Sequence, residues 1–581
     1  MVPTLPALKH ALIAAAIGLG VAVLGGQAQG PVQTPARSFD VLIAGGRIVD
    51  GTGDPWYRGD VGIAGDRIVA IGDLSGATAK TRLDAANLVV APGFIDMLGQ
   101  SEFNILVDNR AASKITQGVT TEVTGEGSAI APVNDRMLRA AEASYKHFGV
   151  VADWRTLAEY FSRLEERTHP AINLATFVGA GGVRDYVIGR EDRPASPAEL
   201  QEMKKLVASA MEDGALGLSS SLQYVPDRFA STDELVELAR VAKQYGGIYI
   251  THQRSEGLKI FESLDEVFAI AERANIAAEI YHLKTAYKPN WGKMPEVLGR
   301  IEAARVRGLD VTANQYPYTR ASNNLDACLP IWVREGGADK MVARLQDPSL
   351  RERIKREMAD ATATSWENQW AGAGGGSGIL VTAVLKPDLK KYEGMTVDQV
   401  GRQTNKDPRD ALMDIVVADH GETVCITSIM NEDDVRTALK SRLVSVGTDS
   451  GAQAVDGPMS ESKSHPRGWG SFPRILGKYV RDEHLLTLEE AVRKMTSQPA
   501  ARVHLDDRGI LRPGMAADIT VFDPATIRDL STFEQPAQYS AGVKYVLVNG
   551  RVVVSGGQIT AERPGRALRG PGYRRPETRR P

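Results

Sequence analysis

Two histidines and an aspartate stand at the ends of apolar segments in the middle of the chain. GIYITH ends at His252, AAEIYH ends at His282 and LVSVGTD ends at Asp449, while Glu126 follows the apolar segment TTEVTG. Imidazole and carboxylate groups both suit Zn²⁺, and a further carboxylate beside such an ion can act as a general base towards water. A lone histidine of this kind is more often a hydrogen-bonded structural residue, but the joint placement favours a metal site.

The fold must bring these segment ends together. The middle of the chain alternates short apolar runs with amphipathic stretches such as SPAELQEMKKLVASAMEDG, a pattern typical of βα units. Eight runs are candidate strands: VVAPGFID, TTEVTG, INLATFV, ALGLSS, GIYITH, AAEIYH, GLDVTANQY and LVSVGTD. The pattern predicts an α/β fold, a (β/α)₈ barrel. Because the carboxyl ends of its strands meet at one face, we expect the four polar residues there.

The two ends of the chain share a sequence pattern that differs from the βα pattern of the middle. DVLIAGGRIVD and DVGIAGDRIVAIGD near the start, and AADITVFDP and KYVLVNGRVVVSGG near the end, read as hairpin strands. We predict one small β-sandwich built from residues 38–93 and 503–560, with a barrel of residues 94–502 between them. The long stretch before the last strand predicts an insertion at about 326–400, and the Pro- and Arg-rich residues 561–581 predict a flexible tail.

The N-terminus carries a pattern typical of export signals. Lys9 and His10 precede the apolar run ALIAAAIGLGVAVLGG, and small residues follow in GQAQG. We expect a signal peptide over residues 1–28 and an exported protein, periplasmic or secreted; an uncleaved anchor is the alternative. No later stretch is apolar enough to span a membrane stably. The net charge of −3 gives no reason to propose nucleic acid as a partner, and two cysteines are too few for a disulfide framework.

A series of motifs resembles the amidohydrolase superfamily and, within it, the N-acyl-D-amino-acid deacylases (D-aminoacylases). The similar stretches follow the family's order over nearly all of residues 38–555: GGRIVDGTG, APGFID, QGVTTEVTGEGSAIAP, GALGLSSSLQYVP, YITHQRSE, IYHLKTA, NQYPYTRASNNL, SVGTDSG, HPRGWGSFPRILGKYVRD, EEAVRKMTSQPA and RGILRPGMAADITVFDP. The resemblance implies zinc-dependent hydrolysis of N-acyl-D-amino acids or related N-acyl amides. The partner it implies is a small-molecule amide substrate with a carboxylate.

The resemblance also implies roles for individual residues. Family histidines that hold the tightly bound zinc match His252 and His282, and the place of the family's cysteine ligand is taken by Glu126. The catalytic aspartate matches Asp449. Residues similar to those that hold the substrate carboxylate are Lys284, Tyr316 and Ser322, with Arg467 as a weaker candidate.

The chain departs from the family after PGFID. The His-x-His pair expected there is replaced by Leu98-Gly99-Gln100. In the family those histidines belong to the second, weaker metal position, so we expect one Zn²⁺ per chain. Gln100 either hydrogen-bonds the attacking water or Asp449, or is a solvated turn residue. His465, in SHPRGWGSFPR, either lines the site or packs against Trp469.

Two other functions compete with this interpretation. A catalytically inactive binding protein on the same fold is favoured by the loss of His-x-His. A cyclic-amide hydrolase of the dihydroorotase or hydantoinase type usually has a modified lysine after the fourth strand, where this chain reads LGLSSSLQYVP. The sequence does not indicate the oligomeric state.

Overall fold

The computed structural model describes residues 38–461 and 463–574. The predicted signal peptide, residues 1–28, lies outside this part of the chain. Among the helices within it, none combines the length and the apolar character needed to cross a membrane.

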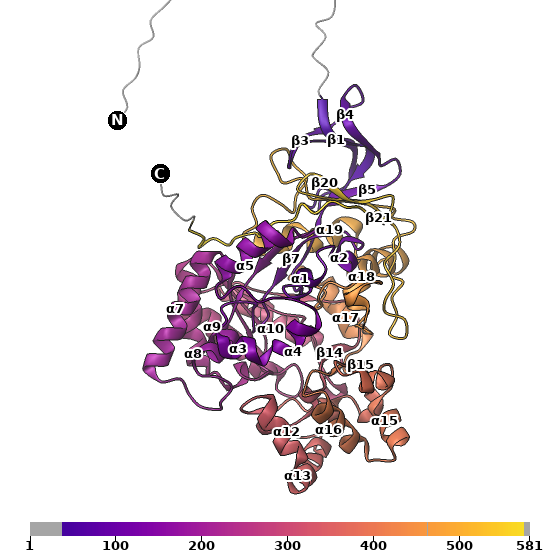
Figure 1. Cartoon of the computed structure of the whole chain (residues 1–581). Coiled ribbons are helices and arrows are strands. Elements are labelled where there is room, and N and C mark those ends of the chain that lie inside the picture. Colours follow the sequence, from indigo (N-terminus) through magenta and orange to yellow (C-terminus); the bar gives the residue numbers. More distant parts are fainter. Residues whose placement is uncertain (1–37, 462, 575–581) are drawn as a thin grey trace, which may run out of the picture.

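The predicted α/β barrel is confirmed, and it fills the middle of the molecule (Figure 1). Each of its parallel strands overlaps one of the eight predicted runs: β6 (Phe94–Asp96), β7 (Val119–Thr124), β8 (Asn173–Thr176), β10 (Gly217–Ser221), β11 (Ile248–His252), β12 (Ala278–Ile280), β13 (Val311–Gln315) and β17 (Val444–Val446). Their hydrogen-bond ladders form a three-stranded and a six-stranded sheet, the latter beginning at β9 (Val178–Gly179). Backbone hydrogen bonds span the two seams. Asp449 N donates to Leu98 O (2.7 Å), Met97 N to Val446 O (3.2 Å) and Gln100 N to Ser450 O (3.2 Å) across one seam, and Leu216 N donates to Thr176 O (2.9 Å) across the other.

Helices cover the outside of the barrel. The principal ones are α5 (Leu157–Arg163), α6 (Ala180–Val187), α7 (Pro197–Asp213), α8 (Thr232–Gln244), α9 (Ile260–Ala274), α10 (Met294–Val306), α17 (Glu432–Lys440), α18 (Arg467–Arg474), α19 (Leu488–Met495) and α20 (Ser497–Arg502). Shorter helices follow β6 and β7: α1 (Asn104–Val107), α2 (Ala112–Ile115), α3 (Asp135–Ala140) and α4 (Glu142–His147).

The sequence of α7 shows why these helices begin, end and pack where they do. Ser196 and Glu199 form a capping box around Pro197, which occupies the first turn, and Gly214 ends the helix in the left-handed conformation (φ 115°). The buried face carries Met203, Val207, Ala210 and Met211, spaced as one stripe of a helix.

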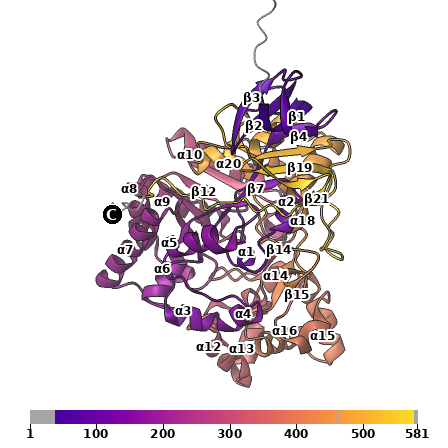
Figure 2. The same cartoon turned by 45° about the horizontal axis from the view of Figure 1, so that its top comes forward.

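Strands from both ends of the chain form a single nine-stranded sheet. The N-terminal strands are β1 (Ser38–Ile48), β2 (Tyr57–Ala64), β3 (Arg67–Gly72), β4 (Thr78–Asp84) and β5 (Val89–Pro92). The C-terminal strands are β18 (Ile519–Phe522), β19 (Val543–Val548), β20 (Arg551–Ser555) and β21 (Gln558–Ile559). Antiparallel pairing of β5 with β18 joins the two groups, and Figure 2 shows them side by side.

The first predicted strand, VVAPGFID, is divided between two sheets, so its treatment as one strand was wrong. VVAP belongs to the nine-stranded sheet, and FID opens the barrel. Gly93 lies between them where the backbone passes close to Thr120: a β-carbon at this position would come within 2.1 Å of Thr120 Oγ1. Only glycine fits such a close approach without displacement of its neighbour.

The long stretch before β17 is a compact subdomain with its own core, which spans more than the predicted 326–400. An antiparallel sheet of β14 (Ala321–Asn324), β16 (Val424–Thr427) and β15 (Ile379–Ala383) packs with α11 (Ile331–Arg334), α12 (Ala338–Gln346), α13 (Pro348–Ala359), α14 (Gln369–Gly372), α15 (Val397–Thr404) and α16 (Pro408–Ala418). Both cysteines are buried in this core as free thiols. Figure 1 shows the subdomain at the opposite end of the molecule from the nine-stranded sheet.

The predicted flexible tail from residue 561 is wrong for residues 561–574, which run along the barrel. Leu568 N donates to Leu174 O of β8 (2.8 Å), and Arg569 forms an ion pair with Glu165 (2.8 Å). Backbone pairing with a barrel strand holds this segment in spite of its composition; residues 575–581 lie outside the described chain.

A buried cluster of charges joins the first strands of the barrel to its last. Lys114 Nζ lies 2.7 Å from Asp96 Oδ2 and 3.3 Å from Glu122 Oε1, and all three side chains are fully buried. The same ammonium group donates to Thr448 Oγ1 (2.7 Å) and to Ser450 O (2.6 Å), next to Asp449. Burial would lower the pKa of Lys114, but the two carboxylates raise it above its usual value, so the group stays charged.

We predict that Lys114→Met destabilises the protein by about 3–5 kcal/mol, because it leaves two buried carboxylates without their cation. Urea denaturation followed by circular dichroism measures the change. The matched control is Lys146→Met in α4, which removes an exposed ion pair with Glu142 and should shift the midpoint far less. Equal midpoints for the two variants would contradict the role given to Lys114.

Candidate metal centre

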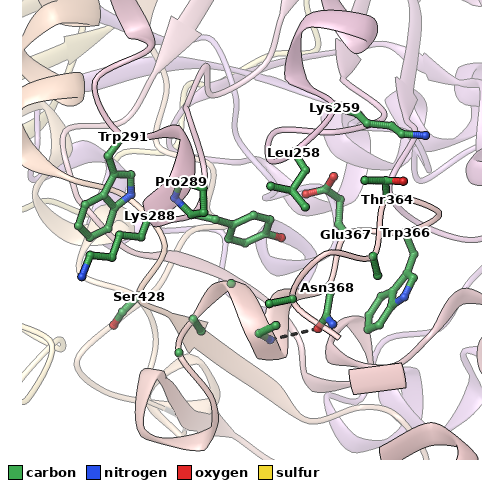
Figure 3. A pocket seen from close by; sticks show the side chains of 17 residues that line it. Leu258, Lys259, Lys288, Pro289, Trp291, Thr364, Trp366, Glu367, Asn368 and Ser428 are labelled. Carbon is green, nitrogen blue, oxygen red and sulfur yellow. Dashed lines mark hydrogen bonds between the residues drawn. The ribbon is translucent and has the colours of Figure 1, made fainter. Parts of the chain in front are cut away.

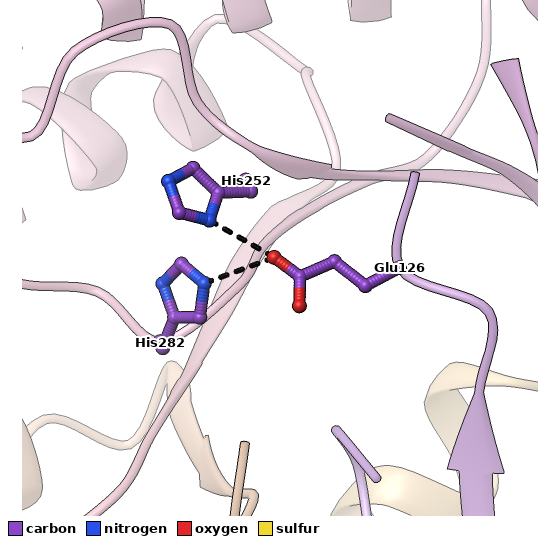
Figure 4. Close-up of side chains that lie close together, drawn as sticks. All are labelled: Glu126, His252 and His282. Atoms are coloured by element: carbon purple, nitrogen blue, oxygen red, sulfur yellow. Dashed lines mark hydrogen bonds and ion pairs between the residues drawn. The ribbon is translucent and has the colours of Figure 1, made fainter. Parts of the chain in front are cut away.

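Glu126, His252 and His282 converge at the C-terminal mouth of the barrel. Glu126 lies in the turn after β7, His252 ends β11 and His282 follows β12. Glu126 Oε1 lies 2.9 Å from His252 Nδ1 and 3.3 Å from His282 Nε2, as Figure 4 shows. One ligand atom from each residue lies within 4.8 Å of the other two. Burial alone would raise the pKa of Glu126, but the two histidines lower it well below its usual value, so the carboxylate is ionised.

Backbone strain marks two residues of this region. His282 and Asp449 both have left-handed backbone conformations, with φ of 33° and 51°. Non-glycine residues adopt this region at an energetic cost, and such residues cluster at functional sites.

Glu256, which the sequence analysis did not single out, supports the histidines from the side away from Glu126. Its Oε1 lies 3.0 Å from His282 Nδ1 and 2.6 Å from Lys284 Nζ, and its Oε2 lies 3.7 Å from His252 Nε2. Burial would raise the pKa of Glu256, but Lys284 and the two histidines lower it below its usual value. Metal-binding histidines commonly use their second ring nitrogen in such a contact with a carboxylate, which fixes the ring. Its position four residues after His252 was the available signal.

Asp449 is held by two donors. Its Oδ1 accepts a hydrogen bond from Gln100 Nε2 (3.0 Å), and its Oδ2 forms an ion pair with Arg467 Nη1 (2.6 Å). Gln100 Nε2 also donates to Glu126 Oε2 (3.0 Å). The amide therefore bridges the metal-ligand carboxylate and the predicted catalytic carboxylate, which agrees with the expectation that Gln100 contacts Asp449.

The place of the family's first histidine is apolar. Leu98 is fully buried and belongs to an apolar cluster that includes Val123 and Ile250. Gly99 packs directly beneath Glu122, because a β-carbon on Gly99 would lie 1.8 Å from Glu122 Oε1. The segment therefore contributes one amide and no metal ligand to the site.

The residues proposed to hold a substrate carboxylate surround the ring of Tyr316. The guanidinium carbon of Arg467 lies 4.7 Å from the ring centroid, and Lys284 Nζ lies 5.6 Å from it. The Tyr316 hydroxyl is buried and has no hydrogen-bond partner within the described residues. Ser322 contributes its backbone carbonyl oxygen, which accepts a hydrogen bond from Arg467 Nη2 (3.4 Å). Lys284 is meanwhile paired with Glu256.

His465 is a structural neighbour of this group. Its Nδ1 accepts from Arg467 N (2.9 Å), so Nε2 carries the proton and donates to Arg320 O (3.0 Å). Burial, then Arg467, lowers its pKa well below the usual value, so the ring is neutral. It packs against the ring of Tyr318 (centroids 5.7 Å apart), while Trp469 Nε1 donates to Ser464 Oγ.

Tyr224 and Ser221 also border the centre and were not predicted. The Tyr224 ring lies edge-on to His252, with centroids 5.1 Å apart. Ser221 Oγ donates to Glu126 Oε1 at 3.4 Å. Both belong to the stretch SSSLQYVP at the end of β10, whose position at the barrel mouth was the signal for them.

Known proteins share this architecture over most of the chain. A model of the amidohydrolase family matches residues 394–554. A D-aminoacylase from Alcaligenes xylosoxydans xylosoxydans is 36% identical over 537 residues, which are 92% of this chain and 99% of that protein. N-acyl-D-glutamate deacylase from Bordetella bronchiseptica, solved with zinc and a phosphonate inhibitor that mimics the tetrahedral intermediate, superposes with a TM-score of 0.77 at 31% identity, covering 92% of this chain and all of that one.

Two further solved structures resemble this chain to different degrees. A D-aminoacylase described in terms of one-metal activation and second-metal attenuation gives a TM-score of 0.76 at 33% identity, over 91% of this chain and all of that one. A dihydropyrimidinase from Brevibacillus agri gives only 0.51 at 17% identity, over 92% and 99% of the two chains, and shares the fold alone. The chain therefore belongs to the amidohydrolase superfamily and, within it, to the N-acyl-D-amino-acid deacylase (D-aminoacylase) family.

Proposed function

We propose that the protein is a zinc-dependent hydrolase that deacylates N-acyl-D-amino acids or closely related N-acyl amides. The observation that carries the proposal is the convergence of Glu126, His252 and His282 beside Asp449 at the barrel mouth. The relatives named D-aminoacylase and N-acyl-D-glutamate deacylase support the substrate class.

The residues fit one zinc ion. Two imidazole nitrogens and one carboxylate oxygen are a common donor set for catalytic zinc, which keeps a coordination position open. The contact of Glu256 with His282 supports the ring in the way that metal-binding histidines require. Leu98 and Gln100 offer no second pair of imidazoles, so we propose one ion per chain, in line with the one-metal activation described for a D-aminoacylase.

The reaction assigns distinct tasks to the chain's own residues. Zinc, when bound, supplies Lewis acidity, which lowers the pKa of water and polarises a carbonyl. Asp449 takes the proton from the attacking water and returns it to the leaving nitrogen. Arg467 and Gln100 occupy one oxygen each and fix the carboxylate's orientation. The products are a free carboxylic acid and an amine.

The proposed substrate carboxylate has a site beside Tyr316. Its hydroxyl is a buried donor without a partner among residues 38–461 and 463–574, and Lys284 and Arg467 flank the ring. The substrate carboxylate would accept a charge-assisted hydrogen bond from the Tyr316 hydroxyl. This contact would orient the substrate's amide group towards Asp449. The contact of Ser322 with Arg467 keeps the guanidinium group at this position.

Export remains part of the proposal. The N-terminal pattern of residues 1–28 favours a periplasmic or secreted enzyme. Fractionation of the producing cells, with mass determination of the mature chain, would test it: full-length protein confined to the cytoplasm would contradict export.

The decisive experiment is a hydrolysis screen of N-acetyl-D- and N-acetyl-L-amino acids with simple amides as comparators. Zinc content is measured on the same preparation. We expect about one zinc per chain and preferential hydrolysis of D-substrates. Bound zinc without turnover of any amide would favour the inactive binding protein, and preferential opening of cyclic amides would favour the hydantoinase type.

We predict that Asp449→Asn lowers kcat by about 10²–10⁴-fold, because the amide cannot accept the proton from water. Zinc content should stay unchanged, since Asp449 is not among the three converging ligands. Steady-state kinetics and metal analysis on one sample check both parts. Asp506→Asn, at an exposed position, serves as the control. Full activity in Asp449→Asn would remove Asp449 from the mechanism.

Glu256→Gln is predicted to weaken zinc binding by about 10–100-fold, because His282 loses the carboxylate that orients its ring. Competition with a chromophoric chelator measures the affinity without relying on turnover. Glu262→Gln, at an exposed position of α9, is the matched control. An unchanged zinc affinity would show that Glu256 acts only through Lys284.

A further inference from the structure

A small cavity of about 10 Å³ lies where the inserted subdomain meets the barrel. The barrel contributes residues of the loop after β10, among them Tyr224 and Arg228. The subdomain contributes residues of α11 and of the segment that leads into α14, among them Arg334 and Glu367. None of the three converging metal ligands lines it. A cavity of this size has room for one water molecule or one monatomic ion.

Arg334 brings an unpaired positive charge to this cavity from the subdomain. It is the last residue of α11, it is buried with 8% exposure, and its Nε has no hydrogen-bond partner within residues 38–461 and 463–574. Its guanidinium group forms no ion pair with a carboxylate in that part of the chain. A buried charge without a counter-ion is costly, because it has lost water and gained nothing in return.

Arg228 borders the same cavity from the side of the barrel. Its Nη1 donates to Arg254 O (3.1 Å) and its Nη2 donates to Ser365 O (2.7 Å). Both acceptors are neutral carbonyl oxygens, and Arg228 forms no ion pair within the described residues. Two positive charges, one from each part of the fold, therefore border one small space. Their repulsion opposes the packing of the subdomain against the barrel.

Glu367 does not neutralise these arginines. It is the one carboxyl group among the described residues that line the cavity, and it hydrogen-bonds the hydroxyl groups of Ser255 and Tyr287 instead. Figure 3 shows its carboxyl group beside Leu258, in the wall of a larger neighbouring cavity of about 270 Å³. Burial raises the pKa of Glu367 to about 7, so a large share of this group is uncharged near neutral pH.

Two glutamine side chains add amide groups to the wall. Gln223 and Gln369 line the cavity and are buried. Gln369 Oε1 accepts a hydrogen bond from Asn323 Nδ2 (2.7 Å), so this amide group offers its N–H groups to other partners. Guanidinium and amide N–H groups around a small space are the donors that an anion requires.

We propose that this cavity binds one monatomic anion, chloride, between the guanidinium groups of Arg228 and Arg334. The ion offsets the repulsion between the two groups and thereby holds the subdomain against the barrel. A water molecule fits the space but brings no charge, and a carboxylate needs room for three heavy atoms. The inference goes beyond the proposed function and does not depend on it.

The cavity has a neighbour in common with the metal centre. Tyr224 lines the cavity, and its ring lies edge-on to His252, with centroids 5.1 Å apart. The open coordination position of a catalytic zinc ion can accept an anion as well. A test of the inference therefore has to give the position of the ion in addition to a response to salt.

Bromide, an anomalous scatterer that replaces chloride, gives the position. Crystals of the zinc-loaded protein soaked in sodium bromide should show an anomalous peak between the guanidinium groups of Arg228 and Arg334. A peak found only beside the zinc ion, or no peak in the cavity, would overturn the inference.

Thermal unfolding of the zinc-loaded protein measures the effect of the ion on the fold. Sodium chloride is compared at equal ionic strength with sodium gluconate, whose anion is too large for the cavity. We expect the midpoint to be higher in chloride by at least about 1 °C and to level off as the site saturates. Equal midpoints in the two salts would mean that any bromide seen in the cavity is an adventitious ion only, and would overturn the inference.

Variants connect the response to the cavity. Arg334→Met should lose the chloride-dependent rise, whereas Arg356→Met, at an exposed position of α13, is the matched control and should keep it. Arg228→Met should lose the rise from the other side of the cavity, which keeps the test valid if Arg334→Met folds poorly. A rise that persists in both cavity variants would overturn the inference.

His282→Ala separates this site from the metal centre. It alters a proposed zinc ligand and leaves the residues of the cavity unchanged, so the chloride-dependent rise should survive, even if the hydrolysis screen is negative. A rise that is lost in His282→Ala and kept in Arg334→Met would place the anion at the zinc ion and overturn the inference, whatever the hydrolysis screen shows.

Discussion

The carboxylate of Glu126 is the constraint on which the centre depends. One of its oxygens faces two imidazoles at 2.9 and 3.3 Å, and the other accepts from Gln100. Burying this charge is costly unless it is paired, and the barrel meets that cost by ending β7, β11 and β12 around one point. The strained backbone of His282 shows that the fold accepts a local penalty to hold this arrangement.

The surrounding charges are arranged in two layers that keep the centre ionised. Glu256 and Lys284 form the layer behind the histidines, and Arg467 neutralises Asp449 on the open side. Lys114 forms a third, deeper group with Asp96 and Glu122 beneath the Gly99 segment. Because each carboxylate has its own cation or donor, a divalent ion would join a site whose geometry is already fixed. Such preorganisation is what electrostatic catalysis requires.

Sequence reasoning reached the parts of this site that follow from strand ends. Glu126, His252, His282 and Asp449 were placed by their position after apolar runs, and the α/β barrel followed from eight such runs. Glu256 was missed because its position four residues after His252 does not by itself indicate the contacts with His282 and Lys284 that give it a role. The division of VVAPGFID at Gly93 and the docking of residues 561–574 were missed for a similar reason: close backbone approach and edge pairing override local composition.

The loss of His-x-His changes how Asp449 is held without removing what the chemistry needs. In a two-metal centre the second ion would also attract the Asp449 carboxylate. Without that ion, one of the two carboxylate oxygens would lack a partner. Here Gln100 donates to that oxygen from the place of the second histidine, while Leu98 fills the first place with apolar volume. The Gln100 amide orients Asp449, while burial raises the pKa of this carboxyl group above its usual value in spite of the opposing charge of Arg467. The departure from the family pattern is thus consistent with a hydrolase built around one ion. A protein that only bound ligands would have no need for the Gln100 amide to bridge Glu126 and Asp449.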